Sequence, residues 1–154
     1  MLSMKTKYAV KALMCLARQY ETDPKGLVLI ADLAEEERIP KKFLELILLD
    51  LKNQGFLQSK KGKGGGYLLD RSPQVIKIGQ VVRALEGTLA PLSCVSQTHY
   101  KACAECPDES TCGLRMVMKE VRDATAKILD GCTLADLIER ERLAGRKDDI
   151  MFHI

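Results

Sequence analysis

Residues 39–70 read IPKKFLELILLDLKNQGFLQSKKGKGGGYLLD, a stretch in which a helical pattern gives way directly to a strand pattern. Its first part repeats apolar residues at the 3.6-residue period of a helix, and Gly55 is typical of the position just beyond a helix C-terminus. Pro40 suits the first turn of that helix, because its missing N–H would have no partner there. The second part, 56–70, has two short apolar runs around a turn rich in lysine and glycine, which predicts a β-hairpin. The apolar face of the helix comprises Phe43, Leu44, Ile47, Leu48 and Leu51.

The sequence before this stretch adds two more helices. Residues 29–37 form a short helical pattern that ends at Ile39, and residues 4–20 carry a longer apolar stripe. Two short helices joined by a tight turn and followed by a hairpin describe a winged helix-turn-helix. We therefore expect residues 1–73 to form a winged helix-turn-helix DNA-binding domain, with the first helix packed on it.

The second half of the chain predicts further helices around a stretch without period. Residues 76–87 read as a helix, and residues 113–131 have apolar positions near heptad spacing, which suits a long helix that packs on a partner helix. Thr133 and Asp136 resemble a capping box that opens a last helix. We expect 74–143 to hold a cysteine loop and a dimerisation helix, and 144–154 to be a disordered tail. The predicted fold class is mainly α with a small β-hairpin.

Composition and charge limit the function. The 154 residues, 46% hydrophobic and 29% charged, suit one folded core. No apolar run approaches the roughly 18 residues of a membrane span, and the charged N-terminus does not resemble a signal peptide, so we expect a cytoplasmic protein without a membrane partner. Residues 1–73 hold 13 Lys+Arg against 9 Asp+Glu, whereas residues 74–154 hold 11 against 12. A local basic patch suits nucleic acid, although a solvated charged face is an equally simple explanation.

Candidate DNA contacts follow from the winged-helix prediction. The N-terminal residues of the second helix of a helix-turn-helix lie nearest the base edges, and there Glu45 either accepts a hydrogen bond from cytosine N4 or pairs with a neighbouring lysine. Lysines and glycines of the hairpin turn can approach phosphates closely. The start of the first helix adds further candidates for phosphate contact. The complete candidate set is Lys5, Thr6, Tyr8, Pro40, Lys41, Lys42, Glu45, Lys60, Lys61, Lys63 and Gly64.

Four of the six cysteines fall within residues 94–112, CVSQTHYKACAECPDESTC. In a reducing compartment, clustered cysteines more often mean metal or redox chemistry than a structural disulfide. Thiolates at Cys94, Cys103, Cys106 and Cys112 together suit an iron–sulfur cluster. Zinc also takes four thiolates, and thiol redox chemistry or no ligand at all are further readings. Cys15 and Cys132 lie in apolar surroundings and are expected to be small hydrophobic residues.

The quoted segments, together with KTKYAVKALMCLA, IGQVVRALEG and TLADL, closely resemble the Rrf2 family of winged-helix transcription regulators over roughly residues 1–140. The resemblance implies a homodimer that binds a palindromic operator in double-stranded DNA, with the helix 113–130 crossing its mate. It also implies a [2Fe–2S] or [4Fe–4S] cluster on the cysteine loop in many members and no cluster in others. Cluster-binding members use three cysteines, to which Cys94, Cys106 and Cys112 correspond. Cys103 is extra, and is either the fourth ligand, an alternative to Cys106 or a bystander.

The fourth ligand of such a cluster is open. Some members of the family have a histidine three residues after the last cysteine, where this chain has Arg115, which cannot ligate as a cation. The alternatives are Cys103, His99, a group from the partner subunit and a small-molecule thiol.

The sequence therefore predicts a homodimeric DNA-binding regulator, most simply a repressor, that senses cluster, redox, nitric oxide or iron status through its cysteine loop. A regulator of the same fold without a cluster, controlled by thiol oxidation or a partner protein, is the alternative. An iron–sulfur electron carrier is a third reading, against which the winged-helix half stands. With two histidines and no Ser/His/Asp, paired-carboxylate or nucleotide-binding arrangement, an enzyme is not expected.

Overall fold

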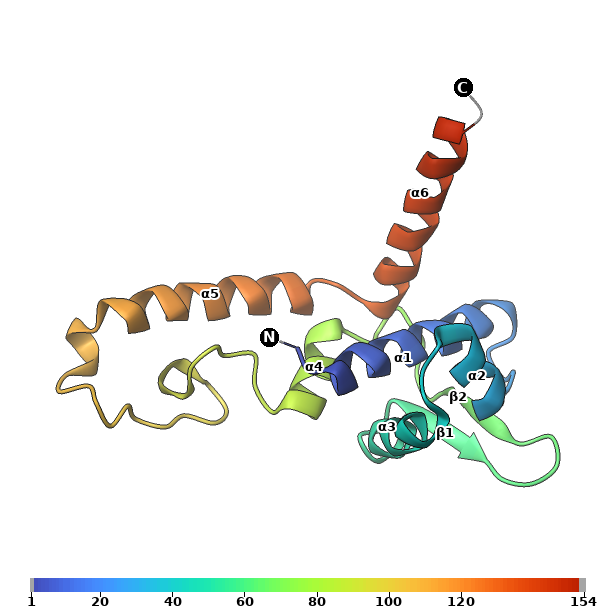
Figure 1. Ribbon diagram of the computed structural model, residues 1–154, viewed down its shortest axis with the longest axis horizontal. Coiled ribbons are helices and arrows are strands. Elements are labelled where there is room, and N and C mark those ends of the chain that lie inside the picture. Colours follow the sequence, from blue (N-terminus) through green and yellow to red (C-terminus); the bar gives the residue numbers. More distant parts are fainter. Residues whose placement is uncertain (1, 153–154) are drawn as a thin grey trace.

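The described part of the chain forms six α-helices and one two-stranded hairpin (Figure 1). The computed structural model describes the backbone of residues 2–152 and the side chains of residues 2–147. Two short 3₁₀ turns, η1 (Ser93–Val95) and η2 (Glu109–Thr111), interrupt the long connection before the fifth helix. The elements are α1 (Met4–Thr22), α2 (Ile30–Glu37), α3 (Lys41–Asn53), β1 (Leu57–Lys60), β2 (Gly66–Leu69), α4 (Ile78–Glu86), α5 (Gly113–Asp130) and α6 (Leu134–Phe152).

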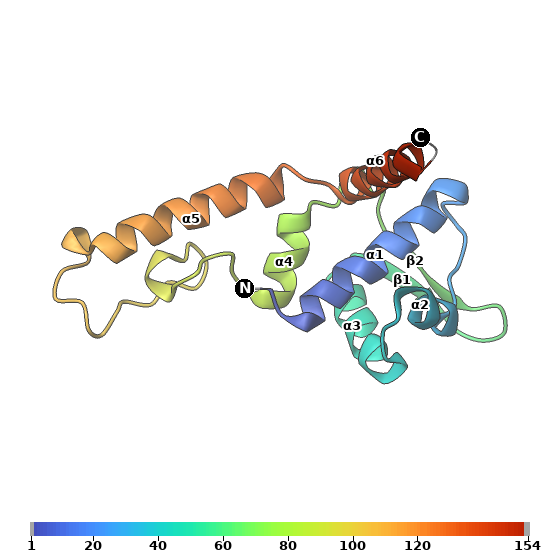
Figure 2. The same cartoon turned by 45° about the horizontal axis from the view of Figure 1, so that its top comes forward.

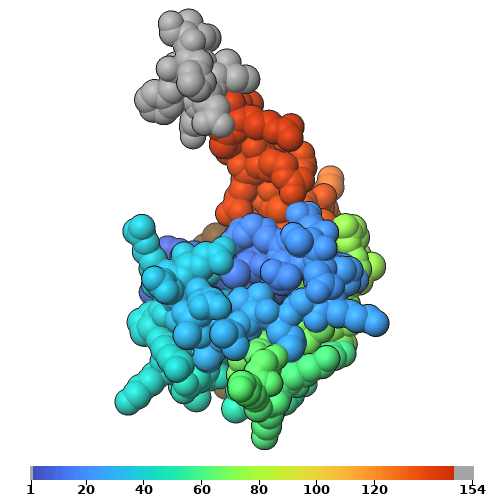
Figure 3. Space-filling view, turned by 90° about the vertical axis from the view of Figure 1, so that its right-hand side faces the viewer, coloured from blue at the N-terminus to red at the C-terminus, as the bar shows by residue number. Residues whose placement is uncertain are grey.

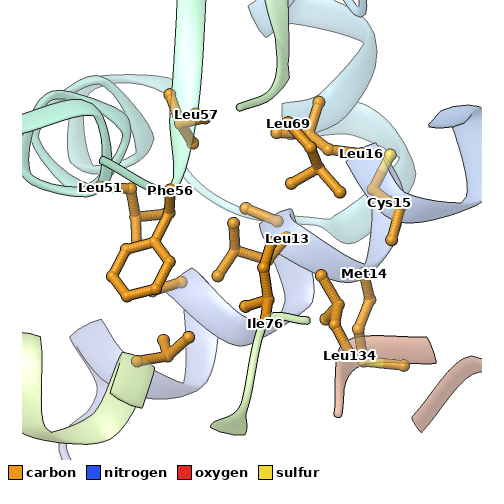
Figure 4. Packing of buried hydrophobic residues seen from close by; sticks show 14 of the residues in the cluster. Leu13, Met14, Cys15, Leu16, Leu51, Phe56, Leu57, Leu69, Ile76 and Leu134 are labelled. Atoms are coloured by element: carbon orange, nitrogen blue, oxygen red, sulfur yellow. The ribbon is translucent and has the colours of Figure 1, made fainter. Parts of the chain in front are cut away.

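Helix α1 lies at the centre of the hydrophobic core, as its apolar stripe predicts. Leu13 and Leu16 are at most 1% exposed and are surrounded by side chains of α3, the hairpin and the start of α6 (Figure 4). The predicted inner face of α3 is confirmed for four of its five members, which are fully buried, and Phe43 packs partly against the core. The residues that surround α1 include Leu44, Ile47, Leu48, Leu51, Phe56, Leu57, Leu69, Ile76 and Leu134.

The turn between α2 and α3 fixes the angle at which α3 leaves the core. Arg38 has φ 54°, the left-handed conformation that ends α2, and Ile39 is buried directly after it. Pro40 is the N-cap of α3 and not its first helical residue, so the helix starts one residue later than expected. These residues give the predicted helix-turn-helix, with the N-terminus of α3 directed to solvent.

The hairpin pairs β1 with β2 in antiparallel register, with Leu57 opposite Leu69 and Lys60 opposite Gly66. Tyr67 and Val28 exchange two backbone hydrogen bonds of 2.9 Å, so the segment before α2 extends the sheet by one bridge. Gly66 has φ 155°, and a Cβ there would lie 2.6 Å from the carbonyl oxygen of Val28. Only glycine fits at this position without moving backbone.

Gly66→Ala is expected to destabilise the fold by about 2 kcal/mol, because the new methyl group would push Val28 away from β2 and strain the backbone. Thermal unfolding followed by circular dichroism measures the change. Gly145→Ala is the matched control, since nothing lies within 4 Å of a Cβ in that helix. An unchanged unfolding temperature for Gly66→Ala would contradict the close contact with Val28.

The second half of the chain does not form a separate core. Ile76 and Val81 from the α4 region and Leu134 and Ile138 from α6 belong to the same buried cluster as α1. The predicted boundary at Pro73 therefore separates sequence motifs and not hydrophobic cores. The capping box of Thr133 and Asp136 is present, with hydrogen bonds of 2.8–3.2 Å between them.

Helix α6 continues to Phe152, so the backbone of residues 144–152 differs from the predicted disordered tail. Ion pairs of Arg18 with Glu141 and of Arg142 with Glu21 join the third turn of α6 to α1, so the helix that leads into this segment is held against the core. Residues 153 and 154 lie outside the described part. Within that part, no helix has the length and apolar character needed to cross a bilayer.

The cysteine-rich connection runs beside α5 as an arm that projects from the winged-helix part (Figures 1 and 2). A bidentate ion pair of Arg83 with Asp130, at 2.6 and 2.8 Å, joins α4 to the C-terminal end of α5. No residue of α5 is buried. A long amphipathic helix without buried residues is typical of a surface that another chain covers.

Candidate functional site

The first turns of α3 present polar side chains to solvent. Lys41, Lys42 and Glu45 are exposed, while the opposite face of the helix is buried in the core. No ion pair involves any of the three within the described residues, so the predicted pairing of Glu45 with a neighbouring lysine is not found. An unpaired carboxylate near the N-terminal end of a helix is available to a hydrogen-bond donor from outside the chain.

Two leucines extend this face beyond the residues that the sequence predicted. Leu46 is 61% exposed and Leu49 53%, and both are on α3. Apolar side chains in such positions can contact thymine methyl groups in the major groove. The available sequence signal was their position: both lie outside the apolar stripe that packs on α1.

The hairpin turn projects from the molecule with its three lysines exposed. In the space-filling view the turn, in green, forms a lower tip beside the cyan surface of α2 and α3 (Figure 3). Lys60, Lys61 and Lys63 are exposed and form no ion pair with any described residue. Gly62 and Gly64 have φ of 94° and 76°, which closes the turn without side chains at its tip.

A groove of about 410 Å³ separates α3 from the hairpin. Its lining contains three lysines, no acidic residue and the exposed leucines Leu29 and Leu49. Lys52 is fixed there, since its Nζ donates to Ser59 Oγ at 2.8 Å. The principal lining residues are Leu29, Leu49, Lys52, Ser59, Lys60, Lys61 and Tyr67. The groove is therefore electrostatically suited to a polyanion.

The candidates at the start of α1 are placed differently from the prediction. Thr6 is fully buried, and its hydroxyl donates to the carboxylate of Glu86, so the predicted phosphate contact of Thr6 is incompatible with the structure. Hydrogen bonds from Ser3 and Thr6 hold the pKa of Glu86 below its usual range. Lys5 forms an ion pair with Asp50 of α3, and the ring of Tyr8 packs edge-on against Phe43 at 5.7 Å. These residues support α3 and lie beside its exposed face.

The cysteine loop, residues 87–112, carries its four cysteines in different environments. Cys94 lies in η1 and is 8% exposed, whereas Cys103 is exposed and its thiol donates to Glu105 at 3.2 Å. Cys106 and Cys112 are half-buried. The loop thus anchors its first cysteine and leaves the later three accessible.

The thiols of Cys106 and Cys112 interact with each other. The backbone amide of Arg115, at the N-terminus of α5, together with Cys106 holds the pKa of Cys112 below its ordinary value. Partial burial and the neighbouring Cys112 raise the pKa of Cys106. Cys112 consequently has the larger thiolate fraction of the two.

The loop cysteines do not form a ready mononuclear metal site. Among the described residues no three of them have their donor atoms within 4.8 Å of one another. Thiolates around one zinc ion lie about 3.8 Å apart, given Zn–S bonds of about 2.3 Å in a tetrahedron. Thiolates on an irregular loop are nevertheless the kind of donor set that iron–sulfur clusters use.

Cys15, Glu36 and Glu37 do have donor atoms within 4.8 Å of one another, on α1 and α2. Burial and the adjacent Glu36 raise the pKa of Cys15 to about 12, so the thiol stays protonated. Arg18 pairs with both glutamates, and Lys11 pairs with Glu37. The cations of the chain already compensate these carboxylates, and the group is an ion-pair network between α1 and α2.

One face of α5 carries an exposed apolar stripe. Leu114, Val117, Val121 and Ile128 are 43–64% exposed and recur at heptad spacing. Met118 and Leu129, two further apolar residues of α5, are half-buried and belong to the side that faces α4 and the loop. A groove of about 530 Å³ between α4 and α5 adjoins the stripe, with Val121 and Ile128 in its wall.

Comparisons with known proteins identify the family. The family model described as Rrf2, iron-dependent transcriptional regulator, matches residues 2–140. The chain belongs to the Rrf2 family. An rrf2-like HTH-type transcriptional regulator of Rhodobacter capsulatus is 39% identical over 138 residues, which cover 90% of this chain and 92% of the relative. The HTH-type transcriptional regulator NsrR of Geobacillus kaustophilus is 33% identical, over 87% of this chain and 86% of its own.

Solved structures of Rrf2-type regulators share the fold. CymR of Bacillus subtilis, described as its global cysteine regulator, has a TM-score of 0.74 at 26% identity and covers 91% of this chain and 97% of its own. IscR of T. potens has a TM-score of 0.72 at 26% identity, and the match covers 94% of this chain and 90% of IscR. These similarities confirm the predicted winged-helix fold and the membership of the Rrf2 family. The relatives from Rhodobacter capsulatus and Geobacillus kaustophilus are both named as transcriptional regulators and not as enzymes.

Proposed function

We propose that this Rrf2-family chain is a homodimeric repressor that binds a palindromic operator in double-stranded DNA and senses iron–sulfur, redox, nitric oxide or iron status through its cysteine loop. The observation that carries DNA binding is the surface of α3 and the hairpin, where Lys41, Lys42, Lys60, Lys61 and Lys63 are exposed without ion pairs among the described residues. Unpaired lysines on one face supply the counterion-release energy of DNA binding.

Each part of this surface has a distinct role in the proposal. The N-terminus of α3 enters the major groove, where Pro40 allows close approach, Glu45 accepts from cytosine N4 and Leu46 contacts a thymine methyl group. The hairpin turn, with Gly64 at its tip, contacts the adjacent minor groove or its phosphates. The groove between α3 and the hairpin takes the sugar–phosphate strand between these two contacts, with Lys52 on its rim.

Dimerisation through α5 would align two such surfaces with the two halves of a palindrome. The exposed stripe of α5 and the groove beside it supply a self-complementary apolar surface, and a second copy of the helix is the occupant with matching chemistry. A mutual crossing of α5 helices would cover the apolar residues that the single chain leaves exposed.

The cysteine loop is the proposed sensor. Cys94, Cys106 and Cys112 would hold a [2Fe–2S] or [4Fe–4S] cluster, with Cys103 as the available fourth thiolate of the chain. Bound there, the cluster would supply a redox-active, nitric-oxide-reactive group. The loop follows α4, whose last residue Glu86 is hydrogen-bonded to the start of α1, so its order can bias the DNA-binding helices.

A second candidate function is thiol-based sensing without a cluster. The interacting pair of Cys106 and Cys112, with the pKa of Cys112 lowered, is the observation that favours it. In that case an intramolecular disulfide, or a partner protein bound at the loop, would replace the cluster as the signal. A simple electron carrier would not require the basic surface of α3 and the hairpin.

The deciding experiment is anaerobic purification with visible absorption and iron, sulfide and zinc assays. We expect matched iron and sulfide in the wild type and their loss in the Cys94→Ala, Cys106→Ala and Cys112→Ala proteins, with Cys132→Ala as a control outside the loop. Operator binding is measured on the same samples with and without the cluster. Iron-free protein would favour the thiol-based alternative, and an unchanged footprint after cluster removal would exclude cluster sensing.

Glu45→Ala is expected to cost roughly 10- to 100-fold in affinity for the cognate operator, the range of one good base contact, and to relax the preference for cytosine at one position of each half-site. Binding to a set of operators with all four bases at that position measures this preference. Glu35→Ala removes an exposed carboxylate on α2 and serves as the control. Uniformly tighter binding by Glu45→Ala to all sequences would mean that Glu45 only repels phosphate.

A further inference from the structure

Two arginines of α5 reach the same short turn of the cysteine loop. Arg115 and Arg122 are seven residues apart, so they lie two turns apart on one face of the helix. Arg115 Nε donates to the carbonyl oxygen of Cys94 at 3.2 Å, and Arg122 Nη1 donates to that of Val95 at 2.6 Å. Both acceptors belong to η1, so α5 forms hydrogen bonds with two consecutive carbonyls of the turn that carries Cys94.

Ion pairs and partial burial of the two arginines strengthen these hydrogen bonds. The side chain of Arg122 is 13% exposed and pairs with Asp123, and that of Arg115 is 30% exposed and pairs with Glu109 at 3.4 Å. Hydrogen bonds from a guanidinium are charge-assisted and roughly twice as strong as neutral ones. Without these hydrogen bonds the turn could move away from α5, and the largely buried Cys94 would then be exposed to water.

Arg115 contacts the loop at two places and is linked to a third through Glu109. Its side chain contacts Cys94 at the start and Glu109 near the end, and Glu109 in turn accepts a hydrogen bond of 2.8 Å from the hydroxyl of Tyr100 in the middle. Arg115 itself lies in the first turn of α5, three residues after the N-cap Cys112. Arg115 thus binds the backbone of the first cysteine of the loop from the helix that begins directly after the last one.

We propose that Arg115 and Arg122 form a clamp that fixes Cys94 against α5, with Arg115 as the residue that positions Cys94 for the cluster. The inference deepens the proposed sensing function and rests on it where the cluster is concerned. Arg115 acts through the backbone of Cys94 and is not a ligand. Because the clamp is part of α5, the loop is ordered on the same helix that carries the proposed dimer stripe.

The test is the alkylation rate of Cys94 in the metal-free, reduced full-length protein. Trypsin releases Cys94 in a peptide without other cysteines, residues 84–101, so iodoacetamide labelling is read for this thiol alone by mass spectrometry. Arg115→Ala and Arg122→Ala are each expected to speed labelling about tenfold, as for loss of one charge-assisted hydrogen bond. Arg115→Lys keeps the charge but not the planar guanidinium, so its labelling rate is expected to lie between those of the wild type and Arg115→Ala.

Matched controls separate the clamp from general loosening. Lys119→Ala removes an exposed cation of the same helix, and exposed Cys103 is a reference whose labelling rate should stay within twofold. Anaerobic cluster reconstitution at limiting iron is the second readout, and Arg115→Ala is expected to load several-fold less iron and sulfide.

Cys94 labelled no faster in Arg115→Ala and Arg122→Ala than in wild type would overturn the clamp. Faster labelling with unchanged cluster loading would overturn the positioning role of Arg115. Wild-type protein that takes up no iron would instead remove the proposed cluster function, and the labelling rates would still decide whether the arginines hold Cys94.

Discussion

Replacement of both Val117 and Val121 by glutamate is expected to leave the protein monomeric and to weaken operator binding by more than 100-fold. The two valines are 52% and 43% exposed in the single chain, at the centre of the apolar stripe of α5. Because about half of each valine is already buried in the single chain, covering the rest in a dimer contributes roughly 1 kcal/mol per side chain, and a two-fold interface counts each change twice. Four unpaired carboxylates in such an interface would add repulsion and desolvation cost.

Sedimentation equilibrium and fluorescence anisotropy with a labelled operator measure the two effects. Lys119→Glu, an exposed position of α5 outside the stripe, is the control and should remain dimeric. Circular dichroism should show unchanged helix content, because the described residues of α5 contribute no buried side chain to the core. A Val117→Glu/Val121→Glu protein that stays dimeric would show that the chains associate through another surface.

Replacement of Lys60, Lys61 and Lys63 by glutamine is expected to weaken DNA binding by about 100-fold or more at 0.1 M salt. The three ammonium groups are exposed on the hairpin turn and have no partner among the residues that the structure describes. If each contacts one phosphate, the slope of log K against log salt should become less steep by about 3. The loss should be similar for cognate and unrelated sequences, because phosphate contacts carry little base information.

The matched control replaces Lys101, Lys119 and Lys127, three exposed lysines of the loop and α5, by glutamine. It removes the same charge from the chain and is expected to change affinity by less than threefold. Equal losses in the two triple variants would mean that overall charge, and not the hairpin, determines affinity. A loss confined to the cognate sequence would assign base readout to the hairpin.

Local patterns predicted most of the winged-helix part. The stripe of α1, the buried face of α3 and the lysine–glycine turn each depend on neighbours a few residues away, so their periods are visible in the sequence. The hairpin was predictable as a turn, yet the role of Gly66 was not. Its requirement comes from Val28, which is distant in sequence and contacts it only after folding.

The candidate site was predicted less completely. Exposure of Lys41, Lys42, Glu45 and the hairpin lysines followed from their positions opposite the apolar face. The prediction that Thr6 contacts phosphate was wrong because its hydrogen-bond partner, Glu86, lies eighty residues away in the chain. The sequence motif of four cysteines indicated thiol chemistry, but it contained no information on which thiols meet.

The sequence by itself determined the helices, the hairpin and the kinds of chemistry that each segment can perform, because these depend on local periodicity and residue type. Only the tertiary structure decided that α4 and α6 share the core of α1, that Arg115 and Arg122 hold the turn of Cys94, and that the stripe of α5 stays uncovered. Those facts depend on contacts between distant segments, which no local pattern encodes.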